Sequence, residues 1–158
     1  MQALIAAQQA RLFRIAFAVC GDADIAEEAV AEAFARAWPR LESGIVEDPG
    51  AYLRRAALNV LHGRFRRLAI ERRARERRNG DGRGAHDVAT GVAERDIVLR
   101  ALRALPERQR AVVALRFYEG LSEAEIAAEL RIPLGTVKST TARATARLRE
   151  LLEESRHD

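Results

Sequence analysis

The chain has 158 residues, of which 48% are apolar and 5% aromatic, and Ala and Leu supply most of the apolar share, so we expect a folded protein with helices rather than strands. Cys20 is its single cysteine and its three histidines are scattered, which excludes a disulfide framework and leaves no metal-ligand spacing. The net charge is +4, and no N-terminal signal pattern or apolar run of about 20 residues occurs. We therefore expect a cytoplasmic, all-α protein with no metal and no cofactor.

Two helices are predicted in the first part of the chain. Residues 2–20 carry apolar side chains at intervals of three and four, and Gly21 is placed to end that helix. Asp24, with Glu27 three residues later, resembles a capping box and predicts the start of the second helix.

The second helix is expected to end near Trp38, because Pro39 follows. Phe34 and Trp38 recur at the spacing of a buried helix face, so we expect both to lie in the core.

A third helix is predicted from Asp48 and Pro49 to at least Leu68, with aspartate as the cap and proline in the first turn. A basic run follows, and residues 79–86 contain three glycines without a hydrophobic period. We therefore expect two small helical modules, each with a modest core, joined by a flexible basic linker. The predicted boundaries are 1–74, 75–93 for the linker, and 94–158.

The charges are divided unevenly along the chain. Residues 1–48 hold 4 basic and 8 acidic side chains, whereas residues 49–93 hold 11 basic and 4 acidic ones. Residues 94–158 are nearly balanced, with 12 basic and 11 acidic side chains. This change from an acidic to a basic stretch favours two partner surfaces of opposite charge.

The C-terminal part contains a helix-turn-helix pattern. Pro106 opens a helix that ends at Tyr118; Ser122 and Glu125 then form a capping box for a short helix, and a final helix runs from Leu134 to about residue 153. On that final helix we expect an inward stripe of Val137, Thr141, Ala144 and Leu148. The outward face would then carry the candidate DNA contacts Thr136, Lys138, Ser139, Thr140, Arg143 and Arg147, with short hydroxyls for base edges and cations for phosphates.

Two sets of motifs resemble the sigma factors of bacterial RNA polymerase. Residues 104–122, together with 135–139 and 146–149, resemble the fourth region of that family, although Arg131 falls where its turn often has glycine. The second region of the family is similar to 21–38, 51–55, Asn59 and 64–67 of this chain. With only these two regions and a short linker, the chain resembles the extracytoplasmic-function (ECF) group.

The resemblance implies a division of roles. The acidic side chains Glu27, Glu28 and Glu32 would dock on the β′ coiled coil of core polymerase. The third helix would hold the melted −10 element, since basic side chains can grip the backbone of an unstacked strand; the candidates are Arg54, Arg55, Asn59, Arg64 and Arg66. The helix-turn-helix would read the −35 element and touch the β flap, and an anti-sigma factor is a further candidate partner.

Other functions account for less of the sequence. A stand-alone helix-turn-helix regulator would leave the N-terminal half unexplained, and a non-initiating sigma-like decoy would occupy polymerase without starting transcription. The residues offer no phosphate loop and no catalytic grouping of Ser, His and Asp or of Cys and His, so we do not expect an enzyme.

Overall fold

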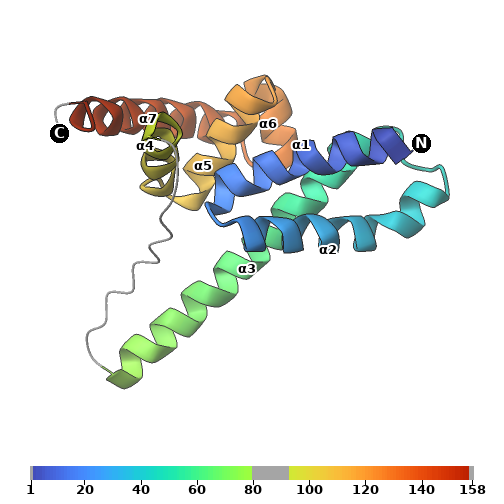
Figure 1. Ribbon diagram of the computed structural model, residues 1–158, viewed down its shortest axis with the longest axis horizontal. Helices are drawn as coiled ribbons and strands as arrows, with labels where there is room; N and C mark the ends of the chain where they lie inside the picture. The colour runs from blue at the N-terminus through green and yellow to red at the C-terminus, as the bar shows by residue number, and fades with distance from the viewer. Residues whose placement is uncertain (1, 80–92, 157–158) are drawn as a thin grey trace.

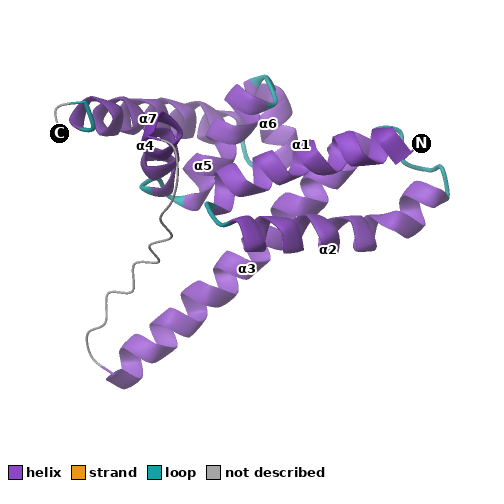
Figure 2. Cartoon of the chain, viewed as in Figure 1, coloured by secondary structure: helices purple, strands orange, loops and turns teal. Residues whose placement is uncertain are grey.

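A computed structural model of the chain describes residues 2–79 and 93–156, and all of its regular elements there are helical (Figures 1 and 2). The elements are α1 (Gln2–Cys20), α2 (Ala23–Glu42), α3 (Pro49–Asn79), α4 (Ala93–Arg103), α5 (Glu107–Val113), the π-helical turn η1 (Ala114–Tyr118), α6 (Glu123–Leu130) and α7 (Leu134–Glu154). The prediction of an all-α fold is confirmed. Most of the predicted linker, residues 80–92, lies outside the described residues, whereas its first part, 75–79, belongs to α3.

The turn between α1 and α2 lies close to its predicted position. Gly21 ends α1 with a φ of +70°, a conformation that residues with a Cβ rarely adopt. The cap of α2 is Asp22 rather than Asp24: its side chain accepts a hydrogen bond from the Ile25 N–H at 3.0 Å. The predicted cap was wrong because Asp24 already lies in the first helical turn.

The end of α2 differs from the prediction. The helix continues through Pro39 to Glu42, and Pro39 is exposed near its C-terminal end. The carbonyl that loses its donor there belongs to Ala35, which is also exposed, so solvent can reach it. The predicted burial of Trp38 was wrong as well: its side chain is 48% exposed, because Ala33 and Ala37 take the buried positions of this last stretch.

Helix α3 is capped as predicted, with Asp48 Oδ1 accepting from the Ala51 N–H at 2.9 Å. Its first half packs on α1 and α2 through Leu53, Leu58 and Leu61. The second half extends away from the rest of the molecule (Figure 1), and its arginines are exposed where their side chains are described.

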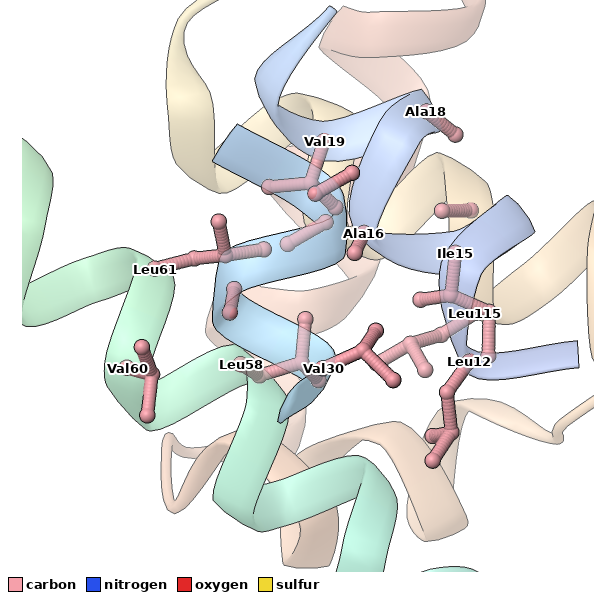
Figure 3. Close-up of a cluster of buried hydrophobic side chains, with 14 of the residues drawn as sticks. Leu12, Ile15, Ala16, Ala18, Val19, Val30, Leu58, Val60, Leu61 and Leu115 are labelled. Carbon is pink, nitrogen blue, oxygen red and sulfur yellow. The ribbon is translucent and has the colours of Figure 1, made fainter. Parts of the chain in front are cut away.

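The core is continuous across the two modules. The buried side chains of Leu12, Ile15 and Val19 on α1 belong to one cluster with Leu115 of the C-terminal module (Figure 3). Val112 belongs to the same cluster. A smaller cluster of Leu102, Leu105, Val113 and Ala144 lies within the C-terminal module. The C-terminal module thus has a modest cluster of its own, and the larger core joins it to the N-terminal module, because α1 contacts α4, α5 and η1 as well as α2 and α3.

Candidate nucleic-acid interface

The helix-turn-helix begins with a complete capping box. Ser122 Oγ accepts a hydrogen bond from the Glu125 N–H at 3.2 Å, and the Glu125 carboxylate accepts one from the Ser122 N–H at 2.7 Å. That backbone donor lowers the pKa of Glu125 below its ordinary value. Because the box satisfies two donors that a helix start leaves unpaired, it defines where α6 begins, as predicted.

The turn between α6 and α7 is tight. Arg131 ends α6 in the left-handed region with a φ of 54°, where glycine is the usual residue. The Ile132 N–H donates to the Ala127 carbonyl at 3.1 Å. The fully buried Ile126 and Val137 belong to the shared core on the two sides of this turn and hold α6 and α7 together.

Helix α7 presents most of its candidate DNA contacts to solvent. Lys138, Ser139, Arg143 and Arg147 are exposed and Thr136 is partly exposed. The guanidinium of Arg143 folds back along the helix, where Nε donates to the Ser139 carbonyl at 3.2 Å and Nη2 to its hydroxyl at 3.4 Å. These side chains form a mixed hydroxyl and cationic surface of the kind that reads base edges and phosphates.

Thr140 does not belong to that surface. Its side chain is only 4% exposed and lies on the same helix face as the buried Val137 and Ala144. Thr141, predicted to face inward, is partly exposed, and its hydroxyl donates to the Val137 carbonyl at 2.8 Å. The assignment of Thr140 as an outward residue was wrong, because the buried stripe runs through position 140 before it reaches 144.

The predicted −10 residues of α3 lie in three different environments. Asn59 and Arg66 are exposed. Arg64 Nη1 donates to Glu28 at 2.7 Å and Nη2 to Glu32 at 3.5 Å, and these hydrogen bonds raise the pKa of Arg64. Arg54, only 9% exposed, is not available to a ligand in this conformation.

A network of ion pairs accounts for the burial of Arg54. Its Nε donates to Glu129 at 3.2 Å and its Nη1 to Glu119 at 3.3 Å, while Arg55 Nε donates to the second oxygen of Glu129 at 3.2 Å. Arg11 on α1 donates to Glu119 through Nε at 2.8 Å. We call these five residues the interdomain network. Nothing in the sequence signals it, because its partners are separated by 65 to 108 positions.

The predicted docking residues lie on α2. Glu27 and Glu28 are exposed, and Glu32 is partly exposed between Arg36 and Arg64, with both of which it forms ion pairs. Two of the three carboxylates therefore already have cationic partners within the chain. The arrangement leaves Glu27 and most of Glu28 facing solvent.

An apolar cavity of about 210 Å³ lies where the C-terminal module meets α1, whose Ala18 contributes to the lining. Its lining includes Val98 from α4, Phe117 and Tyr118 from η1, and Leu148 and Leu152 from α7. Phe117 and Tyr118 are 64% and 61% exposed, because the wide π-helical turn carries them out of the core. Sequence reasoning missed this site, since a five-residue π turn has no periodicity of its own.

Comparisons with known families assign both halves of the chain. Residues 4–78 match the model of sigma-70 region 2, and residues 95–148 match that of sigma-70 region 4. The chain belongs to the sigma-70 family of RNA polymerase sigma factors. Within this sigma factor the first match spans α1 to α3, and the second begins in α4 and ends in α7.

Its relatives assign it to the ECF group. It is 36% identical to the RNA polymerase sigma-E factor of Streptomyces antibioticus over 95% of this chain and 83% of the relative. It is 33% identical to the ECF sigma factor SigL of Mycobacterium tuberculosis over 98% of this chain and 89% of the relative. Both the region order and the ECF resemblance expected from the sequence are confirmed.

A solved structure has the same fold. The sigma factor RpoE of Bartonella quintana, in complex with the anti-sigma factor NepR, matches with a TM-score of 0.76 over 96% of each chain, at 24% identity. Among residues 2–79 and 93–156 of this sigma factor, no helix is long and apolar enough to cross a membrane.

Proposed function

We propose that this sigma factor binds core RNA polymerase in the cytoplasm and directs it to promoters, and that it carries no catalysis of its own. The observation that supports this most strongly is the exposed polar face of α7, which belongs to the same chain as an acidic α2. A stand-alone regulator would need the polar face of α7 to bind DNA but would have no use for an acidic α2. The module boundaries at 74 and 94 remain part of the proposal.

The −35 element is assigned to α7. Its side chains of Thr136, Lys138, Ser139, Arg143 and Arg147 face away from the core, and Arg143 lies beside Ser139. A helix of this kind can enter the major groove with its N-terminal turn at the base edges. Thr140 is left out because it is buried.

The −10 element is assigned to α3. Asn59 and Arg66 are exposed, and Arg64 is held at the α2 contact. Arg54 and Arg55 belong to the same set, although the interdomain network occupies both in this conformation. Guanidinium groups suit this role because they pair with phosphates in the same two-pronged geometry that they use for carboxylates.

Core polymerase is assigned two surfaces. The β′ coiled coil would take the acidic face of α2, with Glu27, Glu28 and Glu32. The β flap would take the apolar cavity beside Phe117 and Tyr118, since exposed aromatic side chains around a hollow are typical of protein-binding sites. The Bartonella relative, solved with an anti-sigma factor, supports such a factor as a third partner.

Binding measurements with and without core polymerase test the proposal. Purified chain would be titrated onto a fluorescent promoter duplex selected from the host genome, alone and with a stoichiometric amount of core. We expect stable binding only with core, followed by opening of the −10 region. Stable duplex binding by the chain alone, with no affinity for core, would return the protein to the class of stand-alone regulators.

A further inference from the structure

Trp38 is an exposed aromatic residue on the acidic helix α2. Phe34, one turn before it, and Leu41, one turn after it, pack against the core cluster, whereas Trp38 is 48% exposed. An aromatic side chain has about 150–250 Å² of surface to bury, so on the order of 100 Å² of this one faces solvent. Trp38 is also the single tryptophan of the chain. Its apolar surface is therefore available to a partner.

Trp38 lies in line with one of the predicted docking residues of α2. Residues three and four positions apart are neighbours on a helix surface, and Glu27, Ala31, Ala35 and Trp38 follow one another at those intervals. All of them are exposed. At 1.5 Å per residue they extend over about 16 Å of the helix. We call these residues the Trp38 face of α2.

The charges around the Trp38 face are divided between the two sides of α2. Glu27 belongs to the face and Glu28 lies beside it, so its N-terminal end is acidic. Arg36 and Arg40 are each two residues from Trp38, which places them on roughly the opposite side of the helix. A partner that covers the Trp38 face must therefore offer cations at one end and an apolar hollow at the other.

Two alanines separate the acidic end of the Trp38 face from the aromatic end. The side chains of Ala31 and Ala35 are single methyl groups, so the surface between Glu27 and Trp38 is low. Two helices approach most closely where the side chains at their contact are small, and their axes can then lie about 8 Å apart. A helix laid along this stretch would meet Trp38 as a projecting side chain to be received between its own residues. The shape of the face therefore suits a helical partner.

We propose that Trp38 is the apolar anchor of the polymerase-docking surface: one helix of the β′ coiled coil lies along the Trp38 face, with basic side chains at Glu27 and Glu28 and an apolar pocket over the indole. This inference rests on the proposed function, because it names a contact residue for the partner assigned there. Tryptophan is one of the residues that carry most of the binding energy in protein interfaces. The carboxylates steer association, whereas the anchor determines how slowly the complex dissociates.

A quenching measurement on the full chain tests the burial of the indole. Because the chain has a single tryptophan, 5-hydroxytryptophan can be incorporated at that position alone and excited selectively over the tryptophans of core polymerase. Acrylamide quenching of its emission is compared for the free chain and for its complex with core. We expect the quenching constant to fall roughly threefold or more on binding, since an interface anchor is shielded from water. Equal quenching in a complex that survives gel filtration would overturn the anchor and leave the proposed function intact.

Substitutions separate the anchor from the charges. Trp38→Ala should raise the dissociation rate from surface-immobilised core roughly 30-fold with little change in the association rate, and Trp38→Phe should recover part of the loss. Glu27→Gln should instead lower the association rate and its dependence on salt. Ala31→Arg should weaken binding roughly tenfold, because it fills the low stretch and repels a basic helix. Ala74→Arg, at an exposed alanine of α3, is the matched control and should bind as the parent does.

The remaining outcomes identify a different occupant or none. Parental dissociation rates for both Trp38→Ala and Ala31→Arg, in chains that keep their helical circular dichroism, would overturn the proposal. Protection of the indole that grows with the concentration of the chain alone would assign the Trp38 face to a second copy of the chain. If the parent chain does not bind core at all, the proposed function fails, and the anchor fails with it.

Discussion

Arg64 on α3 donates a hydrogen bond to Glu28 on α2 across 2.7 Å, which joins a candidate −10 residue to a candidate polymerase-docking residue. The second guanidinium nitrogen of Arg64 reaches Glu32 at 3.5 Å. If a polymerase surface binds Glu28, the hydrogen bond between Glu28 and Arg64 would break. The guanidinium of Arg64 could then pair with a DNA phosphate. The proposed −10 surface and the proposed polymerase-docking surface of region 2 thus meet at Arg64.

Reversing the charge of Glu28 tests the docking surface. Glu28→Lys places a cation beside Arg64 and toward the solvent face of α2, so affinity for core polymerase should fall roughly fivefold or more. Glu42→Lys, at the exposed end of the same helix, is the matched control. Surface-immobilised core would measure both. Undiminished binding by a folded Glu28→Lys chain would remove this face from the docking surface.

Truncating Arg143 tests the recognition helix. Arg143→Ala should lower promoter-specific transcription by roughly 5- to 150-fold, the range for loss of one good base contact. Binding to core polymerase should not change, because the residue lies on the exposed face of α7. Arg108→Ala, an exposed arginine of the same module, controls for charge. Parallel loss of transcription and core binding would contradict the assignment.

The burial of Thr140 predicts opposite outcomes for two neighbouring substitutions. Thr140→Arg forces a cation into the interior of the C-terminal module, so the free energy of unfolding should fall by about 2 kcal/mol or more. Ser139→Arg, one residue earlier on the exposed face, should change it by less than about 0.5 kcal/mol. Urea denaturation measures both. Equal stability of the two variants would mean that position 140 faces solvent.

Local signals explain why much of this fold could be predicted. The capping box of Ser122 and Glu125 and the cap at Asp48 involve residues three positions apart, so their geometry is contained in the sequence. Thr141 belongs to the predicted inward stripe and Thr140 to the predicted outward face, and a helical period alone does not decide which of two neighbouring threonines turns inward. Only packing of the surrounding helices places Thr140 inside.

The strained turn of the helix-turn-helix predicts a stabilising substitution. Arg131 has a φ of 54°, which costs a residue with a Cβ about 1 kcal/mol relative to glycine. Arg131→Gly should therefore raise the free energy of unfolding by up to about 1 kcal/mol, whereas Arg131→Ala should not. Thermal unfolding followed by circular dichroism compares them. A lower melting temperature for the glycine variant would show that the arginine side chain stabilises the fold by more than its left-handed backbone destabilises it.

The capping box predicts a dependence on pH. Ser122→Ala should cost about 1 kcal/mol at pH 7. The backbone N–H of Ser122 lowers the pKa of Glu125 in the folded chain, so the contribution of that carboxylate is present above its ordinary pKa of 4.5 and is lost as the pH falls through the lowered value. The parent chain should therefore be more stable than the Glu125→Gln variant by a larger margin at pH 6 than at pH 3. If the stability advantage of the parent chain grew as the pH fell, the predicted lowering of the Glu125 pKa would be contradicted.

The interdomain network could not be predicted in the same way. Arg54 and Glu129 are 75 positions apart, and each looks like an ordinary solvated helix charge when only its neighbours are considered. The exposure of Trp38 has the same origin, because its apolar spacing is correct but the packing of the helices buries its neighbour Ala37, which is 1% exposed, and leaves Trp38 half exposed. Both depend on how distant helices meet.

Promoter-directed initiation is tested most directly by transcription of fragmented host genomic DNA with purified core polymerase, with and without this sigma factor, followed by sequencing of the RNA 5′ ends. We predict new start sites that share a two-part upstream motif, and the loss of those starts with Arg143→Ala. An unchanged set of start sites, in reactions where the chain is bound to core, would contradict the assignment as an initiating sigma factor.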